Sequence, residues 1–213
     1  MRVGVTMRTS NASGYQEQRD AISHDLSRMI LDLGGVPIPI PNTASDPGMI
    51  VDVIAAERIC LTGGDDLGGF ADLDGSEERT IRDSTEIAVL RRALDNGIPV
   101  IGICRGLQLI NTFFGGGITR NLAAAVPGET HRGAPHPVTL ADGRSIVVNS
   151  FHDDGVLEEQ IAPGLQIFAR SSSGVVEGVR HVSLPVLAVQ WHPERDNPEA
   201  ASFDADLLRE WLG

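Results

Sequence analysis

The sequence predicts an α/β fold in which a mostly parallel sheet is covered by helices on both faces. In the first half of the chain, short apolar runs alternate with amphipathic stretches, and Gly or Pro residues separate them. Such an alternation of strands and helices is typical of a parallel sheet packed between two helical layers. The length of 213 residues suits one α/β domain, and no linker interrupts the pattern. We therefore expect a single domain over residues 1–213.

The first half is expected to supply the parallel strands and their crossover helices. The helix over 17–33 is expected to stop at Gly34–Gly35, and the two prolines of 36–40 favour a sheet edge. Residues 65–80 are rich in Gly and Asp and predict a surface loop beside the preceding strand. The expected strands are 2–6, 36–40, 58–62 and 98–103, and the expected helices are 17–33, 46–55, 79–96 and 105–114.

The second half is expected to be β-rich and to contain antiparallel strands. Turn residues such as Asp142-Gly143 and Ser173-Gly174 separate its short apolar runs. The expected strands are 137–140, 145–149, 165–169, 175–182 and 186–190, followed by an amphipathic helix over 201–212.

Composition excludes several classes of protein. The net charge is −12, with 29 acidic against 17 basic residues, which disfavours a nucleic-acid binder or a protein of anionic membrane surfaces. Two cysteines without C-x-x-C spacing do not suit a disulfide scaffold or a zinc ribbon. The first apolar run is too short for a signal peptide, so we expect a cytoplasmic protein.

The segment Gly102-Ile103-Cys104-Arg105-Gly106 is the strongest sign of chemistry. It joins a buried strand directly to a helix, and its glycines permit a sharp, crowded turn. This is the cysteine counterpart of the Gly-x-Ser-x-Gly elbow, which exposes a nucleophile at a helix N-terminus where a thiolate is favoured. A buried, inert cysteine between turn glycines explains the motif alone equally well.

Two further segments at strand ends supply what a cysteine nucleophile needs. In Gln190-Trp191-His192-Pro193-Glu194, residues i and i+2 of an extended segment point the same way, so Glu194 can orient His192 as a base. In Leu61-Thr62-Gly63-Gly64-Asp65, the glycines let a backbone N–H face the cleft. With the N–H of Arg105 it would form an oxyanion hole. Each segment alone is more often an ordinary turn.

Taken together, these motifs resemble the class I glutamine amidotransferase family. The resemblance covers nearly the whole chain and is most specific at Gly-Ile-Cys-Arg-Gly-Leu-Gln and Trp-His-Pro-Glu. It implies a flavodoxin-like three-layer sandwich and a triad of Cys104, His192 and Glu194. It also implies an oxyanion hole from Gly64 and Arg105, and a contact of Gln108 with the bound γ-glutamyl group.

Within that family the details resemble the γ-glutamyl hydrolase branch, of the γ-glutamyl-GABA hydrolase type. The similar segments are Val3-Gly4-Val5-Thr6, Gly34-Gly35-Val36-Pro37 and Val148-Asn149-Ser150-Phe151-His152. The resemblance implies substrate contacts from Gly63, Ser150, Phe151 and His152. Asp153 stands where a second histidine is common. The segment Tyr15-x-Glu17-x-Arg19-Asp20 resembles members that act on γ-glutamyl-CDP-amidate.

The expected reaction is hydrolysis of a γ-glutamyl amide bond through a thioester, without metal or organic cofactor. Three alternatives stay open: a glutaminase subunit that passes ammonia to a synthetase partner, a cysteine peptidase or chaperone-like member of the fold, and a non-enzymatic binding module. The sequence leaves the leaving group and the oligomeric state open, a homodimer included.

Several residues have no assigned role. His131 and His136 have the spacing of a metal pair, but no third ligand is evident, and a loop or substrate contact is favoured. Cys60 lies in the middle of an expected strand and is interpreted as a core residue. Arg8 follows the first strand, where it could reach an anionic substrate, although a surface role is favoured. The acidic residues between Asp65 and Glu78 suggest a solvated loop.

Overall fold

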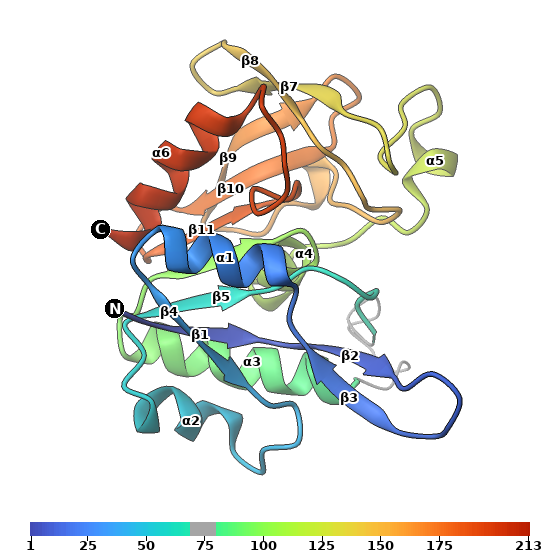
Figure 1. Cartoon of the computed structure of the whole chain (residues 1–213). Helices are drawn as coiled ribbons and strands as arrows, with labels where there is room; N and C mark the ends of the chain where they lie inside the picture. Colours follow the sequence, from blue (N-terminus) through green and yellow to red (C-terminus); the bar gives the residue numbers. More distant parts are fainter. Residues whose placement is uncertain (69–79) are drawn as a thin grey trace.

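The protein is described by a computed structural model, which places residues 1–68 and 80–213 (Figure 1). Its main sheet has nine strands in the order β4-β1-β5-β6-β11-β10-β9-β7-β8, and β2 and β3 form a separate hairpin. The strands are β1 Arg2–Thr6, β2 Arg8–Asn11, β3 Gln18–Ala21, β4 Val36–Ile40, β5 Arg58–Leu61, β6 Val100–Ile103, β7 His136–Leu140, β8 Ser145–Val148, β9 Leu165–Ser171, β10 Val176–His181 and β11 Val186–Val189. The helices are α1 His24–Asp32, α2 Pro47–Val53, α3 Ile81–Asp95, α4 Arg105–Phe113, α5 Leu122–Ala125 and α6 Ala201–Leu212, with a 3₁₀ turn at Glu158–Gln160.

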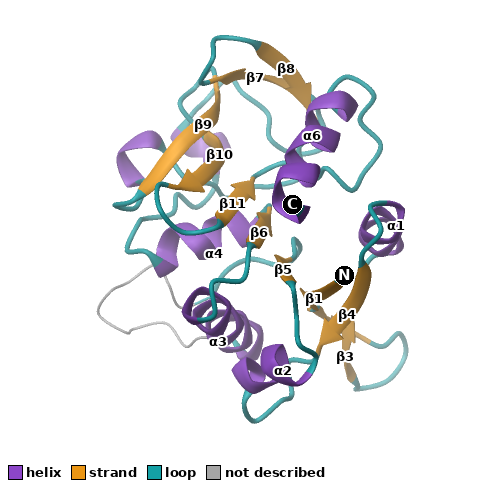
Figure 2. Cartoon of the chain, turned by 90° about the vertical axis from the view of Figure 1, so that its left-hand side faces the viewer, coloured by secondary structure: helices purple, strands orange, loops and turns teal. Residues whose placement is uncertain are grey.

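Helices cover both faces of the sheet, so the predicted three-layer α/β architecture is confirmed (Figure 2). Leu26 and Ile30 of α1 and Leu207 of α6 pack into one core with alternate residues of the parallel strands. On the opposite face, α2, α3 and α4 bury Val51, Leu90, Leu107 and their neighbours against the other set of strand residues. Two cores arise because successive side chains of a strand point to opposite faces.

The sheet changes from parallel to antiparallel at β11, as the sequence predicts for the C-terminal half. Strands β4, β1, β5, β6 and β11 run parallel, whereas β10, β9, β7 and β8 follow in antiparallel pairs. The last strand of the chain therefore returns to the middle of the sheet. β4 is the edge strand that its two prolines require, since Pro cannot donate a ladder hydrogen bond.

The segment at residues 17–33 differs from the prediction of one helix. Residues 18–21 form β3, which pairs with β2, and α1 begins only at His24. The reason is local: Ser23 caps the helix by accepting from Leu26 N, while the preceding residues are polar and lack an apolar stripe. The short α5 and the 3₁₀ turn were not predicted. The loop expected over 65–80 lies largely outside the described residues, and so does the acidic stretch 69–78.

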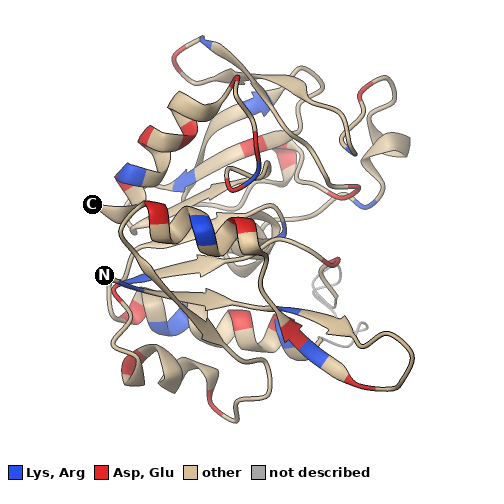
Figure 3. Ribbon diagram, viewed as in Figure 1, with Lys and Arg blue, Asp and Glu red and all other residues tan. Residues whose placement is uncertain are grey.

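Two further features of the structure concern its charge and its helices. Basic residues are spread over both halves of the chain rather than gathered on one element in the view of Figure 3. Across residues 1–68 and 80–213, every helix is too short or too polar to span a bilayer.

Candidate active site

Three motif-bearing segments meet at the carboxyl ends of neighbouring strands. Strand β6 lies between β5 and β11, with Leu61 opposite Gly102 and Val189 opposite Ile103. The residues that follow these strands are Thr62-Gly63-Gly64, Cys104 and Gln190-Trp191-His192. They reach the same edge of the sheet because parallel strands end on one side. The sheet register thus assembles segments that are far apart in the sequence.

Cys104 sits in a strained elbow between β6 and α4. Its φ of 53° and ψ of −103° are unusual for a residue with a side chain, and Cys104 N donates to Val189 O at 2.7 Å. The flanking glycines make the turn possible. A Cβ on Gly102 would lie 2.7 Å from the Gly106 carbonyl carbon, and one on Gly106 would lie 2.5 Å from Leu61 O. The thiol is therefore held at the first turn of α4, where unpaired N–H groups favour an anion.

His192 and Glu194 have the geometry that the sequence predicts. His192 Nδ1 lies 2.7 Å from Glu194 Oε1, and the imidazole is also within hydrogen-bonding reach of the Cys104 thiol. Burial lowers the pKa of His192, but its hydrogen bonds with Cys104 and Glu194 outweigh burial and raise that pKa to about 9. A protonated imidazole is therefore favoured beside the thiol at neutral pH.

Two residues that the sequence analysis did not assign to the site hold His192 and the thiol in place. Asn149 accepts from His192 N at 2.9 Å and donates to His192 O at 2.8 Å, which fixes the backbone of the histidine. Gln190 donates its side-chain amide to Cys104 Sγ at 3.4 Å. Both residues lie in segments that the sequence motifs single out, and their place in those motifs could have identified them as site residues.

The Thr62-Gly63-Gly64 segment borders the thiol and the imidazole. A Cβ on Gly63 would lie 2.8 Å from His192 Cε1 and 3.4 Å from Cys104 Cβ, so the position has no room for a side chain. Gly64 has a φ of +88°, which glycine tolerates without strain. We name residues 62–64 the glycine loop.

Arg82 of α3 fixes the orientation of the glycine loop. Its guanidinium donates to the carbonyls of Thr62, Gly63 and Gly64 at 2.8, 3.0 and 2.6 Å. In a trans peptide the carbonyl and the next N–H point in opposite directions. Because Gly63 O faces Arg82, the N–H of Gly64 points away from Arg82. The arginine therefore sets the direction of a predicted oxyanion donor.

Arg82 belongs to a buried group of four charges, which we name the ionic cluster: Arg82, Asp83, Glu86 and Arg105. Glu86 pairs with Arg82 at 3.1 Å and also with Arg105, which pairs in addition with Asp83. All four are 2% exposed or less. Glu86 carries a lowered pKa: burial raises it, but Arg105 and Arg82 together outweigh burial. The sequence analysis missed this cluster, although charges on the inward stripe of helix 79–96 were a visible signal.

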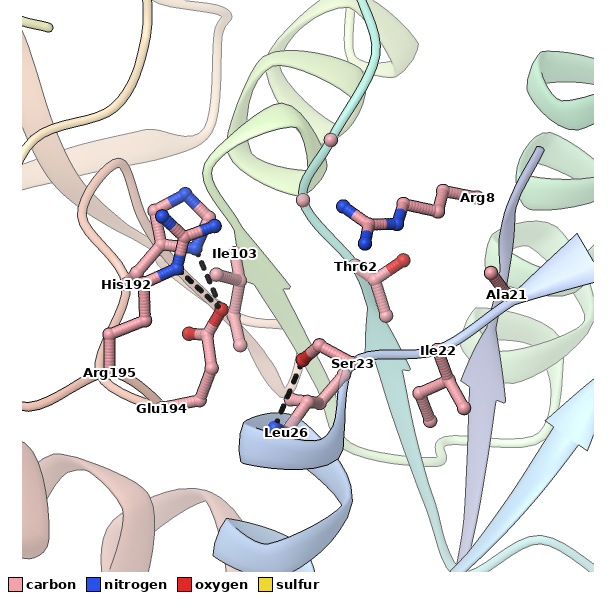
Figure 4. Close-up of a pocket in the computed structure, with 12 residues that line it drawn as sticks. Arg8, Ala21, Ile22, Ser23, Leu26, Thr62, Ile103, His192, Glu194 and Arg195 are labelled. Carbon is pink, nitrogen blue, oxygen red and sulfur yellow. Dashed lines mark hydrogen bonds and ion pairs between the residues drawn. The ribbon is translucent and has the colours of Figure 1, made fainter. Parts of the chain in front are cut away.

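A pocket opens beside these groups. Figure 4 shows His192, Glu194 and Arg195 on one side and Arg8 on the other, facing the same space. Ser23, Leu26 and the two glycines of the glycine loop complete the lining. Two guanidinium groups thus face the pocket near the imidazole. They give it a positive character in a protein whose net charge is −12.

The remaining predicted substrate residues occupy different environments. Phe151 is 45% exposed and its ring lies edge-on to His192, with 5.7 Å between ring centroids. Gln108 is buried and donates to Asp154 O at 2.9 Å. Ser150 is buried and donates its hydroxyl to His131 O. The His152 ring lies 5.0 Å from the His131 ring between centroids, and its Nε2 is 3.8 Å from Glu177 Oε1.

Comparison with known proteins identifies the family. The family model described as Peptidase C26 matches residues 2–194. A putative glutamine amidotransferase-like protein of Lactococcus lactis is 33% identical over 65% of this chain, and the chain spans just under two thirds, 66%, of that relative. The γ-glutamyl-γ-aminobutyrate hydrolase PuuD of Escherichia coli is 28% identical over 93% of this chain and 87% of its own length.

A solved structure agrees with the fold. A putative GMP synthase component from Thermoplasma acidophilum aligns with a TM-score of 0.69 over 100% of this chain and 92% of its own, at 20% identity. The flavodoxin-like architecture that the resemblance implied is thereby confirmed. The chain belongs to the peptidase C26 family, whose members are class I glutamine amidotransferase-like. This membership supports the interpretation that the protein is an amide hydrolase, and a cysteine nucleophile is typical of the family.

Proposed function

We propose that this member of the peptidase C26 family hydrolyses the γ-glutamyl amide bond of a small γ-glutamyl conjugate and releases glutamate. One observation carries the proposal. Cys104, His192 and Glu194 form a continuous row beside the glycine loop, at the carboxyl ends of three adjacent parallel strands. A nucleophile, a base and a group that orients the base are the parts that acyl transfer requires.

In the proposed mechanism, the Cys104 thiolate attacks the γ-carbonyl carbon and forms a C–S bond. The oxyanion is held by the N–H groups of Gly64 and Arg105, the first of which Arg82 aims. Imidazolium His192 donates its proton to the leaving nitrogen as the C–N bond breaks, which leaves a γ-glutamyl thioester. His192 then takes a proton from water, the water attacks the thioester, and glutamate leaves as the thiol is restored.

The environment of His192 supports this division of roles. A pKa raised to about 9 keeps the imidazole protonated at neutral pH, so it is ready to donate to the leaving group. The side chain of Glu194 is 7% exposed, and its carboxylate accepts a hydrogen bond from His192 Nδ1. His192 Nε2 is therefore the ring nitrogen that is left for the reaction.

The pocket supports an anionic substrate. Arg8 and Arg195 face it from opposite sides, and Arg195 also stacks over Phe151 with 4.2 Å from its guanidinium carbon to the ring centroid. A guanidinium pair suits the α-carboxylate of a γ-glutamyl group or a phosphate on the leaving side. We propose γ-glutamyl amines and γ-glutamyl-CDP-amidate as the candidate substrates.

The test is a panel of γ-glutamyl conjugates incubated with the isolated chain, with glutamate release as the readout. The panel includes γ-glutamyl-GABA, γ-glutamyl-CDP-amidate, free glutamine and an α-linked glutamyl peptide as a control. We expect turnover of a γ-linked conjugate and none in the Cys104→Ala variant. Glutamine hydrolysis that appears only with a synthetase partner would favour a glutaminase subunit. Cleavage restricted to α-linked peptides would favour a peptidase.

A further inference from the structure

A second group of polar side chains, four of the five buried, includes His152, which follows Phe151 at the edge of the proposed active site. We name it the histidine cluster: Glu129, His131, His136, His152 and Glu177. Its three histidines are 4–5% exposed and Glu177 is 0% exposed. The rings of His136 and His152 each lie within 5.0 Å of the His131 ring, measured between centroids. None of these side chains has a role in the proposed mechanism.

The histidine cluster contains most of the unpartnered buried atoms of the described chain. Among residues 1–68 and 80–213, eight buried side-chain nitrogen or oxygen atoms have no hydrogen-bond partner, and five belong to this cluster. They are His131 Nδ1 and Nε2, His136 Nδ1, His152 Nε2 and Glu177 Oε2. An unpartnered buried polar atom costs about 1–3 kcal/mol. One bound ligand could satisfy three of these groups together: His131 Nδ1, His152 Nε2 and the Glu177 carboxylate.

We infer that His131, His152 and Glu177 form a binding site for a divalent transition-metal ion of the zinc class. One atom from each of the three residues lies within 4.8 Å of the others. Imidazole nitrogen and carboxylate oxygen are ligands that zinc binds in tetrahedral geometry, with bonds of about 2.0–2.1 Å and therefore about 3.3 Å between ligands. Glu177 Oε1 is 3.6 Å from His131 Nδ1 and 3.8 Å from His152 Nε2, close to that separation.

The outer contacts of the three residues match those of metal ligands. His152 Nδ1 lies 2.9 Å from Asp154 O, which leaves Nε2 to face the centre of the cluster. His131 Nε2 lies 3.3 Å from Glu129 Oε2, close to the carboxylate but without a hydrogen bond, while Nδ1 lies on the side of Glu177. His136 Nε2 contacts Glu177 Oε1 at 3.1 Å, while Oε2 has no partner. Metal-binding histidines usually anchor the second ring nitrogen on a carbonyl or carboxylate in this way.

The position of the site indicates a structural ion rather than a catalytic one. His131 precedes β7, Glu177 lies in β10, and His152 follows Phe151, whose ring borders His192. An ion at this point would join the 149–154 segment to the sheet and fix the wall of the proposed substrate pocket. The inference does not depend on the γ-glutamyl activity, because none of the three ligands belongs to the proposed triad.

Metal uptake by the whole chain tests the site, in the Cys104→Ala background and without a polyhistidine tag. The background removes Cys104, whose sulfur and the neighbouring His192 could bind zinc adventitiously. After dialysis against a chelator, the protein is titrated with Zn²⁺ against a chromophoric chelator and, separately, with Co²⁺. We expect about one ion per chain and the visible bands of four-coordinate cobalt bound by nitrogen and oxygen.

Two variants locate the ion, and a third is the matched control. Glu177→Gln and His131→Ala are each expected to weaken binding at least about tenfold. His24→Ala, which removes an exposed histidine, should leave it unchanged. If folded Cys104→Ala protein takes up no stoichiometric ion, or if Glu177→Gln binds as tightly as its parent, the inference is wrong. Should a ligand variant fail to fold, the stoichiometry and cobalt spectrum of the Cys104→Ala protein still decide.

Discussion

The two buried polar clusters that flank the proposed active site differ in how their groups are satisfied. The ionic cluster sets two guanidinium groups against two carboxylates, and only Arg105 Nε has no partner among the described residues. The histidine cluster sets three imidazoles against two carboxylates and has five unpartnered atoms. The first cluster balances its own charge, whereas in the second one atom each of His131, His152 and Glu177 lies within 4.8 Å of the others.

This difference separates two ways of supporting a reactive site. On the parallel side of the sheet, paired charges hold the glycine loop without help from a ligand, because Arg82 has enough donors for three carbonyls and for Glu86. On the antiparallel side, the 149–154 segment contains His152, one of the three residues that we infer to bind a metal ion. Five predictions test this contrast, from the largest expected effect to the smallest.

The largest effect is expected from the removal of the Cys104 thiol. Cys104→Ala should lower kcat/KM on the γ-glutamyl substrate by about 10⁴-fold or more, because no other group can form the thioester. Both clusters and the melting temperature should be little changed. Cys60→Ala is the matched control: Cys60 is fully buried in β5, burial raises the pKa of its thiol, and its loss should leave kcat intact. Residual activity in Cys104→Ala within tenfold of the parent would contradict the mechanism.

Breaking the ionic cluster should be the most costly change to stability. Arg82→Met leaves Glu86 and three carbonyls short of a donor and should lower the free energy of unfolding by about 3–5 kcal/mol, measured by urea denaturation. Added zinc should not restore it. Arg92→Met, on the same helix, breaks an exposed pair with Asp52 and should cost less than about 1 kcal/mol. Equal costs for the two variants would contradict a special role for the cluster.

Glu194→Gln should change both the rate and its pH dependence. Without the carboxylate, kcat should fall about a hundredfold because the imidazole is no longer oriented. The pKa of His192 is raised to about 9, partly by Glu194, so wild-type activity should decline as the pH rises through about 9 and the imidazolium loses its proton. In the variant this alkaline decline should move to lower pH. Glu199→Gln, at an exposed position, is the control. An unshifted profile would show that another group titrates.

Gly63→Ala tests how closely the glycine loop and His192 must approach each other. The added methyl group would lie 2.8 Å from His192 Cε1, so the imidazole or the glycine loop must move. We expect a loss of about 1–3 kcal/mol in stability and a lower kcat with a smaller change in KM. Gly117→Ala, whose methyl group would have the Gln160 side chain as its nearest neighbour at 3.4 Å, an ordinary contact distance, should behave like the parent.

The smallest effect is expected at Phe151. Its ring is partly exposed and contacts His192 and Arg195, so Phe151→Ala should cost about 0.5–1 kcal/mol in transition-state binding, seen as a few-fold rise in KM. Val182→Ala, at an exposed site, is the control. If Phe151→Ala lowers kcat as much as Glu194→Gln does, the ring has a greater role than a pocket wall.

The sequence by itself determined the architecture and indicated the residues that we propose to be reactive. Hydrophobic periodicity and turn residues predicted the order of strands and helices. A strand or helix that buries one face must repeat its apolar residues at the spacing of that element. The error at 17–33 arose where a polar hairpin carried no such period. Cys104, His192 and Glu194 could be proposed from the sequence because each carries a local signal: flanking glycines for the elbow, and i, i+2 spacing for the histidine and glutamate.

Only the tertiary structure decided which distant polar residues meet. Glu177 lies 46 residues from His131 in the sequence, and only the pairing of β10 within the sheet carries it into the histidine cluster. Arg82 and Arg105 meet through Glu86 because α3 and α4 pack on the same face of the sheet. Contacts of this kind depend on strand order and helix packing, for which a local pattern of residues carries no signal. The sequence therefore located the proposed chemistry of Cys104, and the fold located the two clusters that support it.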